Sequence, residues 1–221
     1  MALGELPETL RLARPGRIVA FGKQDAIAPG YKGAVEAARG GGFEAIQRLA
    51  GGRPAVFHEH TLAFAHAVPD SDPKPGIQAR FDLVAEVMAA AFRRLGVDAR
   101  VGQVAGEYCP GGHSVNAGGR RKLMGVGQRL IAGGAHVGGV VVVDRPDLVN
   151  GILTPVYAAL GLRFDPQATG SLAGEAAGVT LDGVRAAILE EYGTRYELEP
   201  WELDEGTLAL ARSLAPEHLP S

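Results

Sequence analysis

The chain has 221 residues, of which 46% are hydrophobic and 21% are charged. A chain of this length buries roughly 70% of its unfolded surface without a metal or disulfide, and we expect one domain over residues 1–221. The net charge of −3 gives no basic excess for nucleic acid, and the single cysteine, Cys109, excludes a disulfide framework. Because no apolar stretch reaches the length of a membrane span, we expect a cytoplasmic protein with no membrane or nucleic-acid partner.

The 32 glycines are about twice the usual number, and many occur in pairs or triplets without a collagen-like period. Such clusters favour tight turns and places where the backbone lies close to a ligand.

The first half of the chain predicts short strands around one short helix. β-rich runs favour strands over residues 17–21, 43–48, 55–58 and 62–68, with residues 59–61 as a tight connection between the last two. Residues 31–39 favour a helix that ends at the glycines 40–42, and residues 69–75 favour a loop.

The second half opens with the clearest helix, over residues 77–95, where apolar side chains recur at spacings of three and four. Strands are expected over residues 99–101, 121–130 and 135–143, with a glycine-rich loop over 106–119. Helices are expected over residues 146–160, 181–192 and 204–214. This order indicates an α+β fold with a mixed, largely antiparallel sheet and helices on its outer side.

Several familiar site patterns are absent from the sequence. No glycine-rich stretch ends in the Gly-Lys-Ser/Thr of a phosphate-binding loop, and Ser114 lacks the final glycine of a nucleophile elbow. His58 and His60 form a His-x-His pair, but no third ligand has convincing spacing, so we expect no metal site.

Cys109 lies in the loop sequence Glu-Tyr-Cys-Pro-Gly-Gly. A lone cysteine usually behaves as a small buried hydrophobe, but loops carry chemistry more often than packing does. The basic residues Arg120, Arg121 and Lys122 follow, and a nearby cation favours the reactive thiolate. Cys109 is therefore a candidate nucleophile, with a lysine or glycine-loop amides as candidates to stabilise an oxyanion.

Lys122 begins a strand-like run in which alternation would place Lys122, Met124, Val126 and Gln128 on one face. A basic triplet beside a glycine turn is usually a solvated loop edge. A lysine and a glutamine sharing a face with apolar residues instead favour a cavity.

Residues 48–58 combine Arg48 and Arg53 with the glycine pair Gly51-Gly52 and the run Ala-Val-Phe-His. One interpretation is a β-hairpin with a glycine turn. The other is an anion or slender-ligand site built from exposed backbone N–H groups and arginines.

Together these stretches resemble the lipoate–protein ligase and cysteine-dependent octanoyltransferase family, which is related to biotin–protein ligases. Residues 48–58 resemble its first motif, an arginine, a glycine-rich turn and Ala-Val-x-His. Its Lys-x-x-Gly-x-x-Gln-Arg motif is matched by Lys122, Gly125, Gln128 and Arg129. Residues 21–24 and 136–139 resemble two shorter segments, so the likeness runs in order over residues 17–144.

The resemblance implies the catalytic-domain fold of these ligases and a set of roles. Cys109 and Lys122 would be catalytic, with the cysteine about a dozen residues before the lysine motif and Ser114 shortly after it, as in the cysteine-dependent members. A fatty-acyl tunnel would run beneath residues 48–58 toward Lys122, with the Cys109 Sγ near the Lys122 ammonium. The substrate-binding positions would be Arg48, Gly51, Gly52, Val56, His58, Gly125, Gln128, His136 and Gly138.

The activity implied is transfer of an octanoyl or lipoyl group from acyl carrier protein, through a Cys109 thioester, to a lysine of a lipoyl domain or glycine cleavage H protein. This reaction needs no cofactor. One alternative is an ATP-dependent lipoate–protein ligase, which uses ATP and magnesium to form an acyl-adenylate. Another is a non-catalytic lipoyl- or acyl-binding module.

Overall fold

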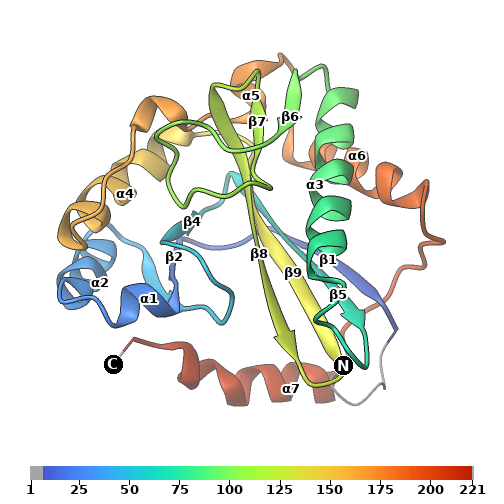
Figure 1. Cartoon of the computed structure of the whole chain (residues 1–221), viewed down its shortest axis with the longest axis horizontal. Helices are drawn as coiled ribbons and strands as arrows, with labels where there is room; N and C mark the ends of the chain where they lie inside the picture. The colour runs from blue at the N-terminus through green and yellow to red at the C-terminus, as the bar shows by residue number, and fades with distance from the viewer. Residues whose placement is uncertain (1–6, 221) are drawn as a thin grey trace.

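The computed structural model describes residues 7–220, and its centre is a six-stranded antiparallel sheet (Figure 1). The strands, in spatial order, are β1 (Thr9–Ala13), β5 (Thr61–Pro69), β9 (Gly134–Val142), β8 (Arg121–Ile131), β7 (Val115–Ala117) and β6 (Ala99–Val101). The long β8–β9 hairpin forms around the expected glycine turn, because Gly133 adopts a φ of +78° that glycine tolerates without strain.

A second sheet of three strands lies beside the first, in the order β3 (Glu44–Gln47), β2 (Ile18–Phe21) and β4 (Ala55–Phe57). β2 pairs in parallel with β3 and antiparallel with β4. The expectation of a mixed, largely antiparallel α+β arrangement is therefore confirmed.

Two groups of helices cover the sheets. The amphipathic helix α3 (Ile77–Arg94) and α6 (Leu181–Gly193) pack on the large sheet, where α3 buries apolar side chains such as Val84, Met88 and Phe92. Helices α2 (Tyr31–Gly40) and α4 (Pro146–Ala159) pack with the small sheet around a second core. The short elements α1 (Lys23–Ala26), η1 (Pro166–Ala168) and α5 (Leu172–Glu175) complete these layers.

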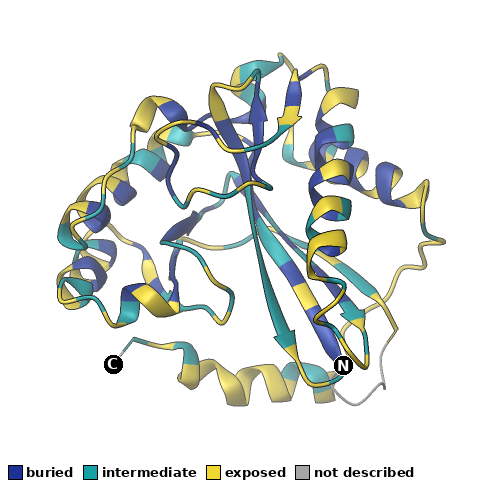
Figure 2. Cartoon of the chain, viewed as in Figure 1, coloured by how far each residue is buried: buried dark blue, intermediate teal, exposed yellow. Residues whose placement is uncertain are grey.

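The C-terminal part ends in α7 (Glu205–Leu214) and η2 (Ala215–His218), and α7 runs beneath the turn of the β8–β9 hairpin in Figure 1. α7 buries none of its residues, as the exposed colour along it in Figure 2 shows. Across residues 7–220, no helix combines the length and the apolar character that crossing a bilayer requires.

Most expected elements are confirmed, but the strand pairing differs in two places and two strands, β7 and β1, are additional. The runs at 55–58 and 62–68 are not a hairpin, because β4 pairs with β2 while β5 lies between β1 and β9 in the other sheet. β3 and β4 do not pair with each other, because β2 lies between them. Residues 48–54 therefore cross over β2 instead of closing a hairpin. The region expected to be only loop, residues 106–119, contains β7. β1 was not anticipated from the sequence.

Candidate active site

A cavity of about 300 Å³ lies where the turn after β3, the middle of β8 and helix α3 approach one another. The fourth wall is the segment of residues 104–114, which we call the Cys109 loop. Seven of the predicted site residues line this cavity: Cys109, Lys122, Arg48, Gly51, Gly52, Gly125 and Gln128. These positions, up to 80 residues apart in sequence, therefore share one pocket.

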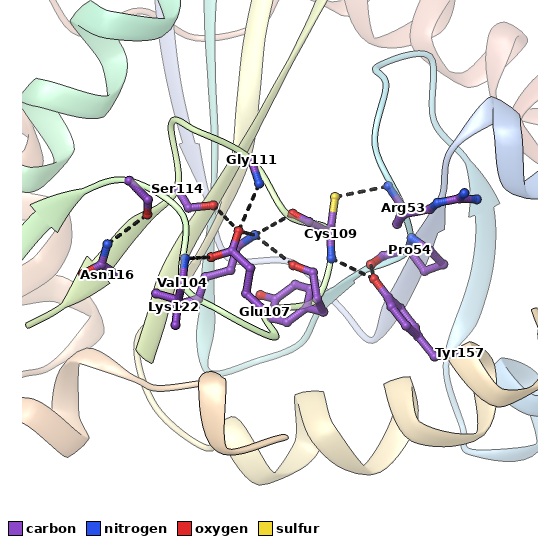
Figure 3. Close-up of polar contacts among 12 residues, drawn as sticks. Arg53, Pro54, Val104, Glu107, Cys109, Gly111, Ser114, Asn116, Lys122 and Tyr157 are labelled. Atoms are coloured by element: carbon purple, nitrogen blue, oxygen red, sulfur yellow. Dashed lines mark hydrogen bonds and ion pairs between the residues drawn. The ribbon is translucent and has the colours of Figure 1, made fainter. Parts of the chain in front are cut away.

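The thiol of Cys109 lies directly against the backbone of the glycine turn (Figure 3). Gly52 has a φ of +100°, and a Cβ there would lie 2.8 Å from the Cys109 Sγ. Glycine thus provides the space in which the N–H of Arg53 donates to Sγ at 3.1 Å. The Arg48 guanidinium lies 3.6 Å from the same sulfur and is the cationic group that contacts it.

Cys109 itself has a φ of +43°, in the left-handed region that non-glycine residues seldom adopt. Two groups hold its backbone there. The N–H of Cys109 donates to the Tyr157 hydroxyl at 2.9 Å, and its carbonyl accepts from the Lys122 ammonium at 2.8 Å. Strain of this kind persists where surrounding contacts impose it, and it is typical of functional loops.

Lys122 is 1% exposed, and its ammonium has three acceptors. It donates to Glu107 Oε1 at 3.1 Å, to the Tyr108 carbonyl at 3.0 Å and to the Cys109 carbonyl at 2.8 Å. Burial lowers the pKa of Lys122, whereas the charge of Glu107 opposes that shift. The ammonium donates to the backbone carbonyl of Cys109 rather than to its sulfur, because a buried cation needs strong acceptors, and the two carbonyls and the carboxylate provide them.

Glu107 was not among the predicted site residues, yet it organises the Cys109 loop. Its buried carboxylate accepts from the N–H of Val104, the N–H of Gly111 and the hydroxyl of Ser114, in addition to Lys122. These donors lie on both sides of Cys109 in sequence. The sequence contained one signal for this role. An acidic residue stands two positions before the loop cysteine, and a lysine that could pair with it stands thirteen positions after that cysteine.

Of the four β8 residues predicted to share a face, Met124, Val126 and Gln128 lie toward α3, whereas Lys122 does not. Opposite Val115 and Asn116 of β7, β8 contains one extra residue. The side chains that follow this bulge therefore point to the face opposite to the one that simple alternation from Lys122 predicts. Lys122 consequently lies with Gly125, where a Cβ would be 3.2 Å from the Lys122 Cε, while Met124 packs in the core with α3. Gln128 faces α3, accepting from the Arg80 side chain at 2.9 Å and donating to the Ile77 carbonyl.

Four predicted substrate-binding residues do not line the cavity: Val56, His58, His136 and Gly138. Side chains alternate along β4, so Ala55 and Phe57 face the cavity. The predicted residues Val56 and His58 point the other way and are buried. His136 is exposed on β9, and the cavity is bordered there by Gly139 and Val140.

Further cavity residues come from α3 and the end of the Cys109 loop. The rings of Phe81 and His113 stack with their centroids 4.9 Å apart, and both residues line the cavity. The His113 Nε2 also lies 3.1 Å from the Asp82 carboxylate, so the Cys109 loop is tied to the helix. Within residues 7–220, no three His, Cys, Asp or Glu side chains gather as a metal-binding group.

Comparison with known proteins identifies the family. Residues 1–192 match the family model described as the lipoyl protein ligase A/B catalytic domain. The chain belongs to this family. Among curated relatives, an octanoyl-[GcvH]:protein N-octanoyltransferase of Geobacillus kaustophilus is 28% identical over 119 residues, which are 54% of this chain and 42% of that protein. The chain thus spans less than half the length of the relatives it matches.

Solved structures agree with this assignment at the level of the fold. A bi-partite lipoate protein ligase from Thermoplasma acidophilum superposes with a TM-score of 0.74 at 18% identity, over 96% of this chain and 81% of its own. A lipoate-protein ligase A bound with ATP gives a TM-score of 0.74 at 19% identity, over 96% and 83%. The expected ligase-type catalytic fold is therefore confirmed.

Glu107 and Lys122 form a buried ion pair, so we expect substitutions of the two residues to have non-additive effects on the free energy of unfolding. Replacing the lysine alone, Lys122→Met, leaves a buried carboxylate without its cation and should lower the free energy of unfolding by about 3–5 kcal/mol. Adding Glu107→Gln removes that charge while keeping an acceptor for Ser114, so the double variant should regain most of the loss. Urea unfolding of the two single variants and the double variant measures this coupling. Additive losses would show that the two residues do not act as a pair.

His58 predicts an acid-dependent loss of stability that is separate from the site chemistry. It is fully buried, and burial lowers its pKa from 6.5 to about 4. In the unfolded chain the imidazole takes up a proton near pH 6.5, while in the folded chain it stays neutral until about pH 4. Its contribution is therefore complete above pH 6.5 and is lost as the pH falls from 6.5 to 4, by about 3 kcal/mol at most.

The matched variant is His58→Asn, whose side-chain oxygen replaces the Nδ1 that accepts from the His60 N–H. Unfolding free energies of both proteins are measured by urea titration between pH 4 and pH 8. The difference between them should shrink as the pH falls. A constant difference over this range would contradict the neutral, buried state of His58.

Proposed function

We propose that this chain is an acyltransferase that carries an octanoyl or lipoyl group on Cys109 and passes it to a lysine of a lipoyl domain. The observation that carries this proposal is the placement of the thiol. Cys109 Sγ borders a cavity with a largely glycine and apolar lining, and it accepts from a backbone N–H while an arginine lies beside it. Both groups favour the thiolate, which is the nucleophile in acyl transfer.

The first proposed step moves the acyl group from a thioester donor to the enzyme. The Cys109 thiolate adds to the carbonyl carbon, the C–S bond to the donor breaks, and the donor leaves as a thiolate that takes up a proton. One thioester replaces another, so the step is nearly isoenergetic and requires no ATP. The negative charge on the transient tetrahedral intermediate would be stabilised by the Arg48 guanidinium and by Lys122, which borders the same cavity.

In the second step the amine of the acceptor lysine attacks the Cys109 thioester. A C–N bond forms, the C–S bond breaks, the amine loses a proton and the cysteine is regenerated. An amide is more stable than a thioester, so this step is downhill. Acyl carrier protein is the proposed donor, and octanoylated GcvH protein is the other candidate, because the relatives are octanoyl-[GcvH]:protein N-octanoyltransferases.

Intact-mass spectrometry tests the proposal directly. The protein is incubated with octanoyl-acyl carrier protein, with octanoylated H protein, or with octanoate, ATP and magnesium, each with and without a lipoyl domain. We expect a hydroxylamine-sensitive octanoyl adduct from a protein-bound donor and no adduct on Cys109→Ala. Because the chain has one cysteine, a thioester adduct can form at no other residue.

The outcomes separate the alternatives. Octanoylation of the lipoyl domain only in the presence of ATP, at equal rates in the wild type and Cys109→Ala, would replace the transferase by an ATP-dependent ligase. Binding of octanoate without any transfer under the three conditions would indicate a non-catalytic module.

A further inference from the structure

The strained backbone of Cys109 and the turn that contacts its sulfur are joined by a third segment of the chain. The hydroxyl of Tyr157, in helix α4, accepts from the Cys109 N–H at 2.9 Å and donates to the Pro54 carbonyl at 3.3 Å (Figure 3). Pro54 directly follows Arg53, whose N–H donates to the Cys109 Sγ. One hydroxyl therefore binds both the backbone of the cysteine and the turn before β4 that supplies the hydrogen-bond donor to its sulfur.

The surroundings of Tyr157 make this bridge rigid. The residue is 3% exposed, and its ring packs against Phe164 with centroids 5.1 Å apart. Burial raises the pKa of Tyr157, so the hydroxyl keeps the proton that it donates to Pro54. α4 also packs against α2, which anchors the tyrosine in the core beside the small sheet rather than in a mobile loop.

The left-handed conformation of Cys109 needs such anchors. Its carbonyl is held by Lys122 and its N–H by Tyr157, so both ends of the strained residue are fixed. Without the hydroxyl, the partly buried Cys109 N–H would lose its partner, and the residue would be free to relax toward an ordinary conformation. Relaxation would move Sγ away from the Arg53 N–H.

From this arrangement we infer that Tyr157 is a positioning residue, which sets the distance between the Cys109 thiol and the Arg53 N–H and thereby the reactivity of the thiol. It acts through Cys109 and does not itself line the cavity. The inference rests on the proposed function for its catalytic meaning, but thiol reactivity can be measured without any acyl donor.

The test compares Tyr157→Phe with Tyr192→Phe. Both changes remove one buried hydroxyl and keep the ring, but the Tyr192 hydroxyl has no hydrogen-bond partner among residues 7–220 and lies in the other core. Iodoacetamide alkylation reports on Cys109 alone, because it is the single cysteine. For Tyr157→Phe we expect the alkylation rate constant at pH 7 to fall about tenfold, because the sulfur moves away from the Arg53 N–H that bonds to it.

Acyl transfer provides the second readout. In Tyr157→Phe the turnover number should fall about tenfold with little change in KM, and Tyr192→Phe should match the wild type in both assays. A wild-type alkylation rate constant in a folded Tyr157→Phe protein would overturn the inference, even if transfer through Cys109 is established. Conversely, a wild-type chain that is never acylated would refute the proposed function. The alkylation rate constants would still test whether Tyr157 positions the thiol.

A measurement on the unmodified protein keeps the inference testable if Tyr157→Phe does not fold. Hydrogen exchange followed by NMR should show that the Cys109 amide is protected, since its N–H is bonded to Tyr157. Exchange of that amide at the rate of an exposed loop amide would contradict the bridge.

Discussion

The burial of one ammonium group determines how the site is built. Lys122 lies within the fold at 1% exposure, and a cation there is tolerated only with strong acceptors. Its acceptors are Glu107 and two consecutive backbone carbonyls, so the lysine fixes the path of the loop at the residue that carries the thiol. The strained conformation of Cys109 follows from this constraint together with the Tyr157 bridge.

The glycines of the site act together with this loop. Gly52 leaves space for the Cys109 sulfur, Gly125 leaves space for the Lys122 side chain, and a Cβ on Gly127 would contact the glycine turn at Gly51. Each position lets two backbone segments, or a backbone and a functional side chain, approach closely. The high glycine content is thus partly explained by the cavity and by the closeness of its walls.

Local sequence patterns were sufficient for much of the fold and for part of the site. The apolar periodicity of residues 77–95 identified α3, and the glycine turn at Gly133 placed the β8–β9 hairpin. Local patterns could not reveal the extra residue in β8, which reverses the faces that simple alternation predicts. Glu107 and Tyr157 were missed because their roles depend on contacts with residues brought near only by tertiary packing, as in the bridge from α4 to Pro54.

If Cys109 carries the acyl group as proposed, the acyl chain should occupy the cavity between β8 and α3. A crystal structure of the protein after reaction with an octanoyl thioester tests it most directly. We expect electron density that is continuous from the Cys109 Sγ into the space bordered by Val126 and Phe81. An acyl chain bonded to another residue, or one that leaves the sulfur toward solvent with the cavity unfilled, would contradict it.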